Sequence, residues 1–260
     1  MTATVATPIL EVRDISLRFA ALLALNRVSL EIRRGEIVAI IGPNGAGKTS
    51  LINVISGFYQ PNAGQILFEG RERTHMKPYE VAELGIARTF QNVALFKGMS
   101  VLDNIMTGRL LKMRGSFVLD ALWVGPAKKQ ELEHRAFVER IIDFLAIEAI
   151  RKTPAGRLPY GLQKRVELAR ALAAEPTLLL LDEPMAGMNV EEKEDMCRFI
   201  LDVNSEFGTT IALVEHDMSV VMDISDRVAV LDYGIKIADG TPDDVRRNQA
   251  VVDAYLGVAH

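Results

Sequence analysis

The sequence predicts an α/β protein in which a mainly parallel sheet is accompanied by N-terminal antiparallel strands and an inserted helical subdomain. Short apolar runs alternate with helical patterns along most of the 260 residues. Two of these runs, Ile37–Ile41 and Thr177–Leu181, are apolar almost throughout, which is typical of parallel strands buried on both faces. From Val93 to about Gly156 the apolar spacing becomes helical, and this change marks the insertion.

The first elements follow from residue alternation and from turn residues. Strands are predicted at Leu10–Phe19 and Val28–Ile32, with a turn near Asn26 between them. The buried strand at 37–41 leads into a glycine-rich loop. The next helix shows its apolar spacing from Ser50 and is expected to end near Gly57.

The later elements are placed by the same rules. Within the insertion, the apolar residues of 131–145 lie on one side of a predicted helix. The elements predicted after it are a helix at 162–174, a strand at 177–181, a helix at 190–207, a strand at 209–214, a hairpin of 227–231 with 236–238, and a terminal helix capped by Thr241, Pro242 and Asp244. We therefore assign residues 8–92 and 157–260 to a core and 93–156 to a helical subdomain, within one domain spanning 9–257.

Composition excludes several classes of protein. Thirty Lys and Arg against thirty-four Asp and Glu give a formal charge of −4, the wrong sign for a broad nucleic-acid surface. Cys197 is the single cysteine of the chain, so an internal disulfide and a Cys-rich zinc site are excluded, and we expect it to pack in a helix. No apolar stretch approaches the roughly 18 residues of a membrane span, and the first eight residues lack a secretory pattern. The sequence therefore predicts a protein of a reducing compartment that does not cross a membrane by itself.

A glycine-rich loop between the buried strand and the first helix predicts a phosphate site. Its residues are Gly42, Pro43, Asn44, Gly45, Ala46, Gly47, Lys48 and Thr49, followed by Ser50 in the helix. The glycines allow backbone N–H groups to point into one concavity at a helix N-terminus, which favours phosphate oxygens. Lys48 is expected to reach the β- and γ-phosphates of ATP, and the Thr49 hydroxyl to bind Mg²⁺. A chance glycine-rich turn is the alternative, but the strand-loop-helix setting favours a P-loop NTPase (RecA-like) core.

Two adjacent acids, Asp182 and Glu183, follow the second buried strand. The carboxyl edge of a parallel sheet is where open α/β folds bind ligands. A bound Mg²⁺ would relieve the repulsion between the two carboxylates, with Asp182 in the metal shell and Glu183 as general base for the attacking water. The alternative is a solvated acidic turn.

These motifs resemble the ABC ATPase family over residues 10–256, and the resemblance implies further site residues. Phe19 stands where the family stacks an aromatic on adenine, although a core aromatic is the alternative. Gln91 is similar to the glutamine that senses Mg²⁺ and water, and His216 to the histidine that hydrogen-bonds the γ-phosphate. The segment 186–189, which ends in Asn189, matches the loop that contacts the second subunit of a dimer.

The segment Leu158–Gln163 resembles the ABC signature but departs from it twice. Pro159 replaces the usual Ser and offers neither a hydroxyl nor an N–H, and Leu162 replaces the usual Gln. Tyr160, Gly161 and Leu162 at the helix start can still present N–H groups to the γ-phosphate of a partner subunit. The resemblance thus implies catalysis by a homodimer, or by a heterodimer with a related ATPase.

Five segments resemble the branched-chain amino acid importer ATPases, namely 22–25, 56–61, 87–91, 214–218 and 254–257. This resemblance implies permease subunits in the membrane, indirect work with a periplasmic or extracellular binding protein, and a place on the cytoplasmic face of the inner membrane. Phe96, Phe117 and Trp123 are candidate permease contacts, with packing inside the subdomain as the alternative.

Other ABC functions remain open from the sequence. Related ATPases serve urea or amide import and lipopolysaccharide export. A soluble ABC ATPase acting on DNA or ribosomes is a further possibility, although the chain has neither a long coiled coil nor a second cassette. The departures at Pro159 and Leu162 also fit a module that senses ATP without hydrolysing it.

Overall fold

The computed structural model describes residues 8–113 and 126–256. The chain divides into two compact units. Unit 1 contains residues 1–88, 177–184 and 200–260, and unit 2 contains residues 89–176 and 185–199. The helical subdomain expected at 93–156 falls within unit 2, and its proposed boundaries stay a prediction.

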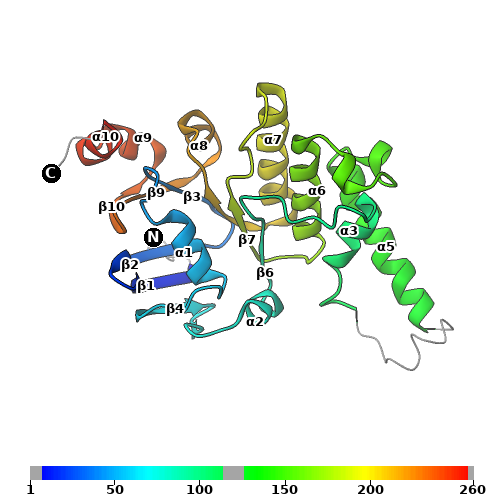
Figure 1. Ribbon diagram of the computed structural model, residues 1–260, viewed down its shortest axis with the longest axis horizontal. Helices are drawn as coiled ribbons and strands as arrows, with labels where there is room; N and C mark the ends of the chain where they lie inside the picture. Colours follow the sequence, from blue (N-terminus) through cyan, green and yellow to red (C-terminus); the bar gives the residue numbers. More distant parts are fainter. Residues whose placement is uncertain (1–7, 114–125, 257–260) are drawn as a thin grey trace, which may run out of the picture. The chain divides into compact units, whose positions relative to one another are not determined.

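Unit 1 begins with an antiparallel sheet in the order β2-β1-β4-β5. Its strands are β1 (Pro8–Phe19), β2 (Leu22–Arg33), β4 (Ala63–Phe68) and β5 (Arg71–Glu72), and the first three lie side by side in Figure 1. The predicted antiparallel strands are therefore present, but the predicted turn near Asn26 is wrong. β1 and β2 pair out to Phe19 with Leu22, so the chain reverses at residues 20–21, where Ala20 has a φ of 49°.

The second sheet of unit 1 has the order β10-β9-β3-β8-β7-β6. Its strands are β3 (Ile37–Ile41), β6 (Ile86–Arg88), β7 (Leu178–Asp182), β8 (Thr210–Val214), β9 (Arg227–Asp232) and β10 (Ile235–Gly240). All pair in parallel except β10, which is antiparallel to β9. The mainly parallel sheet predicted from the apolar runs is confirmed.

The strands β3, β7 and β8 are buried on both faces, which explains why their sequences show no alternation of apolar and polar residues. Val38 and Ile40 of β3 pack into a core shared with the antiparallel sheet and helix α1 (Lys48–Ile55). Ala39 and Ile41 face the opposite core, which also contains residues of α8 (Met218–Ile224), α9 (Pro242–Arg247) and α10 (Gln249–Leu256). Each strand residue therefore removes apolar surface from water, whichever face it is on.

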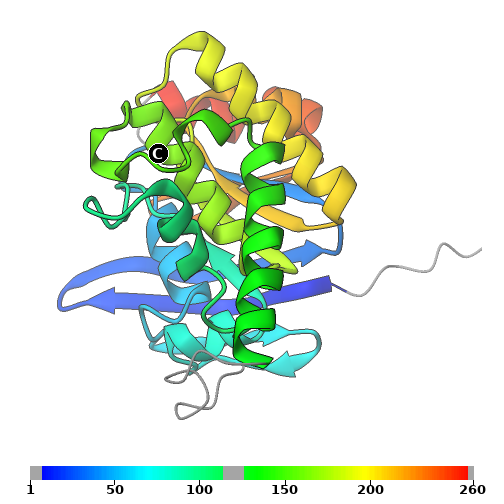
Figure 2. The same ribbon diagram turned by 90° about the vertical axis from the view of Figure 1, so that its right-hand side faces the viewer.

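Unit 2 is helical. Helices α3 (Val101–Thr107), α5 (Pro126–Phe144) and α6 (Tyr160–Leu172) pack against one another, as Figures 1 and 2 show. The residues they bury include Ile105, Val138, Ile142, Val166 and Ala169. The remaining elements are α2 (Pro78–Glu83) of unit 1, the 3₁₀ turns η1 (Glu148–Ile150) and η2 (Ala155–Arg157) of unit 2, and α7 (Val190–Phe207), which the division cuts at residue 200.

Among the helices of the described residues, none is both long enough and apolar enough to span a bilayer.

A partly buried ion pair joins β10 to β9 at the edge of the parallel sheet. The Arg227 guanidinium donates to both carboxylate oxygens of Asp239, at 2.6 and 2.8 Å, and Lys236 Nζ donates to the same carboxylate at 2.6 Å. Burial by itself raises the pKa of Asp239, but these hydrogen bonds and charges outweigh it and hold the pKa below its usual value. The ionised carboxylate is therefore favoured in the folded state.

We expect Asp239→Asn to lower the free energy of unfolding near neutral pH by about 1–3 kcal/mol, since it removes charge-assisted hydrogen bonds. Because the folded-state pKa is depressed, this stabilisation exists above the unfolded-state pKa and is lost as the pH falls through the folded-state value. Urea unfolding of both proteins from neutral pH into acid should show the difference shrinking. The exposed Asp223→Asn is the control, and a difference that stays constant with pH would contradict the prediction.

Candidate functional site

The glycine-rich loop leaves β3 and enters α1 in a conformation that only glycine allows at two points. Gly42 has a φ of 147° and Gly47 a φ of 102°. A Cβ on Gly42 would lie 2.0 Å from the carbonyl oxygen of Leu231, and one on Gly47 would lie 2.8 Å from that of Ala24. Backbone atoms of neighbouring strands lie close to the loop at both glycines. The loop can therefore keep this conformation only if positions 42 and 47 carry no side chain.

Lys48 is the first residue of α1 and is buried. Its Nζ donates to the carbonyls of Gly42 and Pro43, at 2.7 and 3.0 Å, so it lies across its own loop. Burial lowers the pKa of Lys48, while the negative charges of Glu183 and Asp182 oppose that change. The predicted acids therefore act electrostatically on the predicted phosphate-binding lysine. Within the loop, Asn44 and Gly45 are exposed, and Thr49 and Ser50 are half-buried.

The two acids occupy different environments. Asp182 ends β7 with no exposed surface, and it forms a 3.0 Å ion pair with Arg88. Glu183 is half-buried and has a φ of 50°, which is unusual for a residue with a side chain. Its backbone N–H donates to the carbonyl of Val214 at 2.9 Å. This left-handed turn directs the chain away from the sheet just after Asp182, and such strain is characteristic of functional sites.

Strand register brings these groups to one edge of the parallel sheet. Ile40 of β3 pairs with Val214 of β8, and Val214 pairs with Asp182 of β7. The glycine-rich loop, His216 and Glu183 follow these three strand residues within two positions. The His216 side chain is 60% exposed, and its Nδ1 lies 3.9 Å from the carboxylate of the buried Glu215.

Phe19 ends β1 in unit 1 and is 42% exposed. Its ring meets that of Tyr59 edge to face, with centroids 5.0 Å apart. Phe19 is therefore more exposed than an aromatic residue of the hydrophobic core, although it contacts a second ring. Tyr59 could not be identified from the sequence as the neighbour of Phe19, because their proximity arises from the pairing of β1 with β4.

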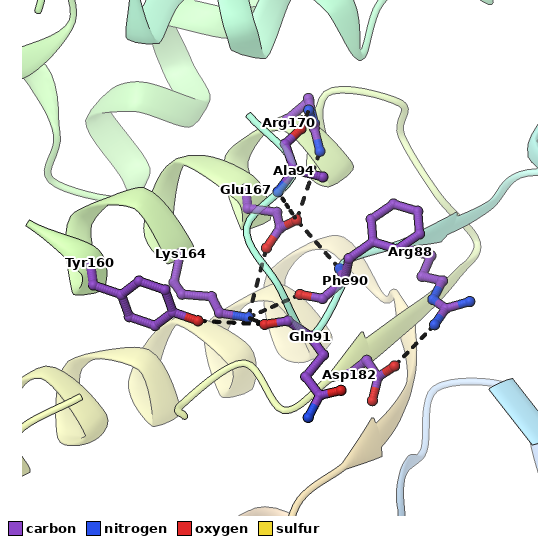
Figure 3. Close-up of polar contacts among 9 residues, drawn as sticks. All are labelled: Arg88, Phe90, Gln91, Ala94, Tyr160, Lys164, Glu167, Arg170 and Asp182. Carbon is purple, nitrogen blue, oxygen red and sulfur yellow. Dashed lines mark hydrogen bonds and ion pairs between the residues drawn. The ribbon is translucent and has the colours of Figure 1, made fainter. Parts of the chain in front are cut away.

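Unit 2 contains Gln91 and the signature segment, and α6 holds the backbone around Gln91. Lys164 Nζ donates to the carbonyls of Phe90 and Gln91, at 2.9 and 2.7 Å. One carboxylate oxygen of Glu167 accepts from the N–H groups of Phe90 and Ala94, at 3.4 and 3.3 Å. Figure 3 shows these side chains projecting from α6 onto the segment 90–94.

The same face of α6 carries a third charged residue. Arg170 donates to the carbonyl of Ala94 at 2.6 Å, and it lies 3.8 Å from the carboxylate of Glu167 (Figure 3). Lys164 and Glu167 have only 3% and 1% of their surface exposed. Lys164, Glu167 and Arg170 together form what we name the α6 clamp. Sequence reasoning missed it, although the spacing of three places the residues on one helical face.

The signature residues lie at the start of α6. Pro159 is the N-cap and makes no side-chain cap, and Tyr160 is 40% exposed. The Tyr160 hydroxyl lies 3.5 Å from the Gln91 carbonyl, so the structure brings these two predicted site residues together. Gly161 is buried beneath the Glu192 carboxylate, which would lie 2.3 Å from a Cβ on Gly161. Leu162 is half-buried.

Asn189, from the predicted dimer-contact loop, caps α7. Its side-chain oxygen accepts from the Glu192 N–H at 2.9 Å, and the Glu192 carboxylate accepts from the Asn189 N–H at 3.0 Å. This reciprocal pair is a capping box.

Cys197 lies half-buried in α7, and its thiol donates to the sulfur of Met185 at 3.8 Å. The predicted helix-packing position is confirmed. Of the candidate permease contacts, Phe96 is 56% exposed in unit 2, whereas Phe117 and Trp123 lie outside the described residues.

A glycine-rich loop, a buried lysine, two acids and a histidine at the carboxyl edge of one parallel sheet define a nucleotide-binding cassette of the P-loop class. A family model described as ABC transporter matches residues 25–186. A second model, described as branched-chain amino acid ATP-binding cassette transporter, matches residues 236–260. The chain belongs to the ABC transporter family of nucleotide-binding ATPases.

Relatives of this family match nearly the whole chain. The high-affinity branched-chain amino acid transport ATP-binding protein BraF of Pseudomonas aeruginosa is 41% identical over 97% of this chain and 99% of its own length. LivG of Escherichia coli, described in the same words, is 37% identical over 97% of this chain and 99% of its own length. An ABC transporter cassette solved in its ADP conformation superposes with a TM-score of 0.84 at 32% identity, covering 97% of this chain and all of that one.

We expect Lys164→Met to lower the free energy of unfolding by about 3 kcal/mol near neutral pH, since it leaves the buried Glu167 with a weaker cation partner and frees two carbonyls. Burial raises the pKa of Glu167, with Lys164 first and then the hydrogen bonds and Arg170 opposing it. Loss of Lys164 would raise that pKa further.

A protein that contains a carboxyl with a raised folded-state pKa becomes less stable as the pH rises through that pKa. The loss of unfolding free energy caused by Lys164→Met should therefore be smaller in acid than at neutral pH. Thermal or urea unfolding of both proteins, from acid to neutral pH, measures this difference in stability. Lys152→Met, at an exposed lysine of unit 2, is the control. Equal deficits in acid and at neutral pH would show that the Glu167 charge is not involved.

Proposed function

We propose that this ATPase powers the import of branched-chain or related amino acids. Two observations support the proposal. The phosphate loop and both acids meet at one sheet edge, and the C-terminal residues 236–260 match the model named for branched-chain amino acid cassettes. The match at the C-terminus favours this cargo class over urea, amides or lipopolysaccharide.

ATP would bind with its phosphates on the loop residues 42–50 and its adenine against Phe19. Lys48 would exchange its two loop carbonyls for phosphate oxygens, an exchange favoured by the stronger charge of the phosphates. Thr49 and Asp182 supply hydroxyl and carboxylate oxygens, and these hard donors fit Mg²⁺. Gln91 is the third proposed contact to the metal and the attacking water.

Hydrolysis requires a base, and Glu183 is the residue proposed for it. Mg²⁺, when bound, would offset the negative charge of the phosphates. Glu183 would accept a proton from the attacking water, and His216, exposed beside Glu215, would hydrogen-bond the γ-phosphate.

Two subunits would be needed to complete each site. The first-turn N–H groups of α6, at Tyr160, Gly161 and Leu162, would meet the γ-phosphate bound by the other subunit of a homodimer or heterodimer. ATP then joins the subunits, and release of its products allows them to separate. The exposed apolar residues of unit 2, including Phe96, are proposed to contact permease subunits on the cytoplasmic face of the inner membrane.

We expect Lys48→Ala to weaken ATP binding at least about tenfold, since it removes a charge-assisted contact to phosphate. Glu183→Gln should bind ATP as tightly as the native chain but hydrolyse it about 10² to 10⁴ times more slowly. Titration with a fluorescent nucleotide and phosphate release from the complex with its permeases measure the two quantities. The exposed Lys112→Ala is the control for charge.

Two outcomes would contradict these assignments. Unchanged affinity in Lys48→Ala would remove the loop from nucleotide binding. A native complex that binds ATP without any turnover would instead support the ATP-sensing alternative.

We expect leucine, isoleucine or valine, loaded on the cognate binding protein, to stimulate ATP hydrolysis by the complex reconstituted in liposomes with its permeases. The same liposomes should accumulate radiolabelled leucine with ATP inside them, and those carrying Glu183→Gln should not. Urea and short amides are the competing cargoes. Stimulation by these compounds alone would contradict the assignment to amino acids while leaving the ATPase intact.

A further inference from the structure

Arg88 is a buried cation to which none of the recognised motifs assigns a role. It ends β6, and 8% of its side chain is exposed. One terminal nitrogen donates to Asn53 Oδ1 at 2.5 Å and to Ser56 Oγ at 2.9 Å. The other donates to Asp182 Oδ2 at 3.0 Å, as Figure 3 shows. The guanidinium therefore joins the end of β7 to helix α1 within unit 1.

The α1 side of this contact is set by helical periodicity. Thr49, Asn53 and Ser56 are four and three residues apart, so they lie along one face of the helix. Asn53 and Ser56 are the residues that Arg88 holds, and Thr49 is the proposed metal-binding hydroxyl in the first turn. Arg88 thus fixes the helix face that carries Thr49.

The β7 side of this contact is the other proposed metal donor. Asp182 is fully buried, so its carboxylate orientation depends on hydrogen bonds from the protein. A planar guanidinium directs separate N–H groups to two partners at fixed angles, whereas a lysine ammonium offers a single flexible point charge. One side chain therefore spaces the two elements from which the metal donors project.

We infer that Arg88 is a positioning residue for magnesium: it holds Asp182 and the Thr49 face of α1 in the relative geometry that a Mg²⁺-nucleotide requires. The inference rests on the proposed Mg²⁺ site. Residues that hydrogen-bond a metal-ligating carboxylate affect metal affinity about 10- to 100-fold when changed. A purely structural ion pair would affect folding and not the metal.

The test measures ATP affinity twice, once with Mg²⁺ and once with EDTA, for the native chain, Arg88→Met and Arg88→Lys. We name the dissociation constant in EDTA divided by the dissociation constant in Mg²⁺ the magnesium gain. Arg88→Met should reduce this gain about tenfold or more and leave the EDTA affinity unchanged, because Lys48 and the loop are intact. The magnesium gain of Arg88→Lys should lie between those of the native chain and Arg88→Met.

Arg227→Met is the matched control, since it breaks another largely buried arginine-aspartate pair of unit 1. It should lower stability and keep the magnesium gain. Asn53→Ala removes only the α1 side of the contact, so it tests the inference if Arg88→Met fails to fold, and it should also reduce the gain. In an Asp182→Asn background, Arg88→Met should have no further effect on the gain.

The outcomes separate the two levels of the proposal. A native chain without any magnesium gain would overturn the Mg²⁺ site itself. A native gain that survives in both Arg88→Met and Asn53→Ala would overturn only the role of Arg88. A larger gain in Arg88→Met would also overturn it, because Arg88 would then compete with the metal as a cation and not position its ligands.

Discussion

The parallel pairing of β3, β8 and β7 is the constraint on which the candidate site depends. Ile40, Val214 and Asp182 form one row across these strands, so the glycine-rich loop, His216 and Glu183 emerge from the same edge. A shift of one residue in any pair would turn every side chain of that strand to the other face. Both faces are buried, so such a shift also costs packing on both sides of the sheet.

Buried charges fix local geometry within each of the two units. Arg88 joins α1 to Asp182 in unit 1, and the α6 clamp holds the backbone of residues 90–94 in unit 2. A buried cation is costly unless its donors are paired, and here the partners are carboxylates and backbone carbonyls. Such pairing restricts geometry more than it adds stability, which suits elements that must present oxygen and nitrogen atoms at fixed positions.

The sequence predicted the strands of the parallel sheet and the residues of the glycine-rich loop because apolar runs and motif spacing are local. It placed the β1–β2 turn wrongly, since the pairing of Phe19 with Leu22 is decided by contacts across the sheet. The contacts of Arg88 and Tyr59, and the α6 clamp, were missed for a related reason. A charged or aromatic residue in the sequence shows neither the direction of its side chain nor the distant partner that compensates its burial.

Helix α6 links two groups to which the family resemblance assigns roles in ATP hydrolysis, namely the signature residues at the γ-phosphate and Gln91 at Mg²⁺ and water. Its first turn carries Tyr160 and Gly161, and its clamp fixes the backbone of Gln91. Pro159 cannot supply a hydroxyl, so recognition by this turn would depend on backbone N–H groups, and their direction is the direction of the helix. Any rotation of α6 that improves this contact must also move the Gln91 backbone, because the buried Lys164 would otherwise lose its hydrogen bonds to two carbonyls.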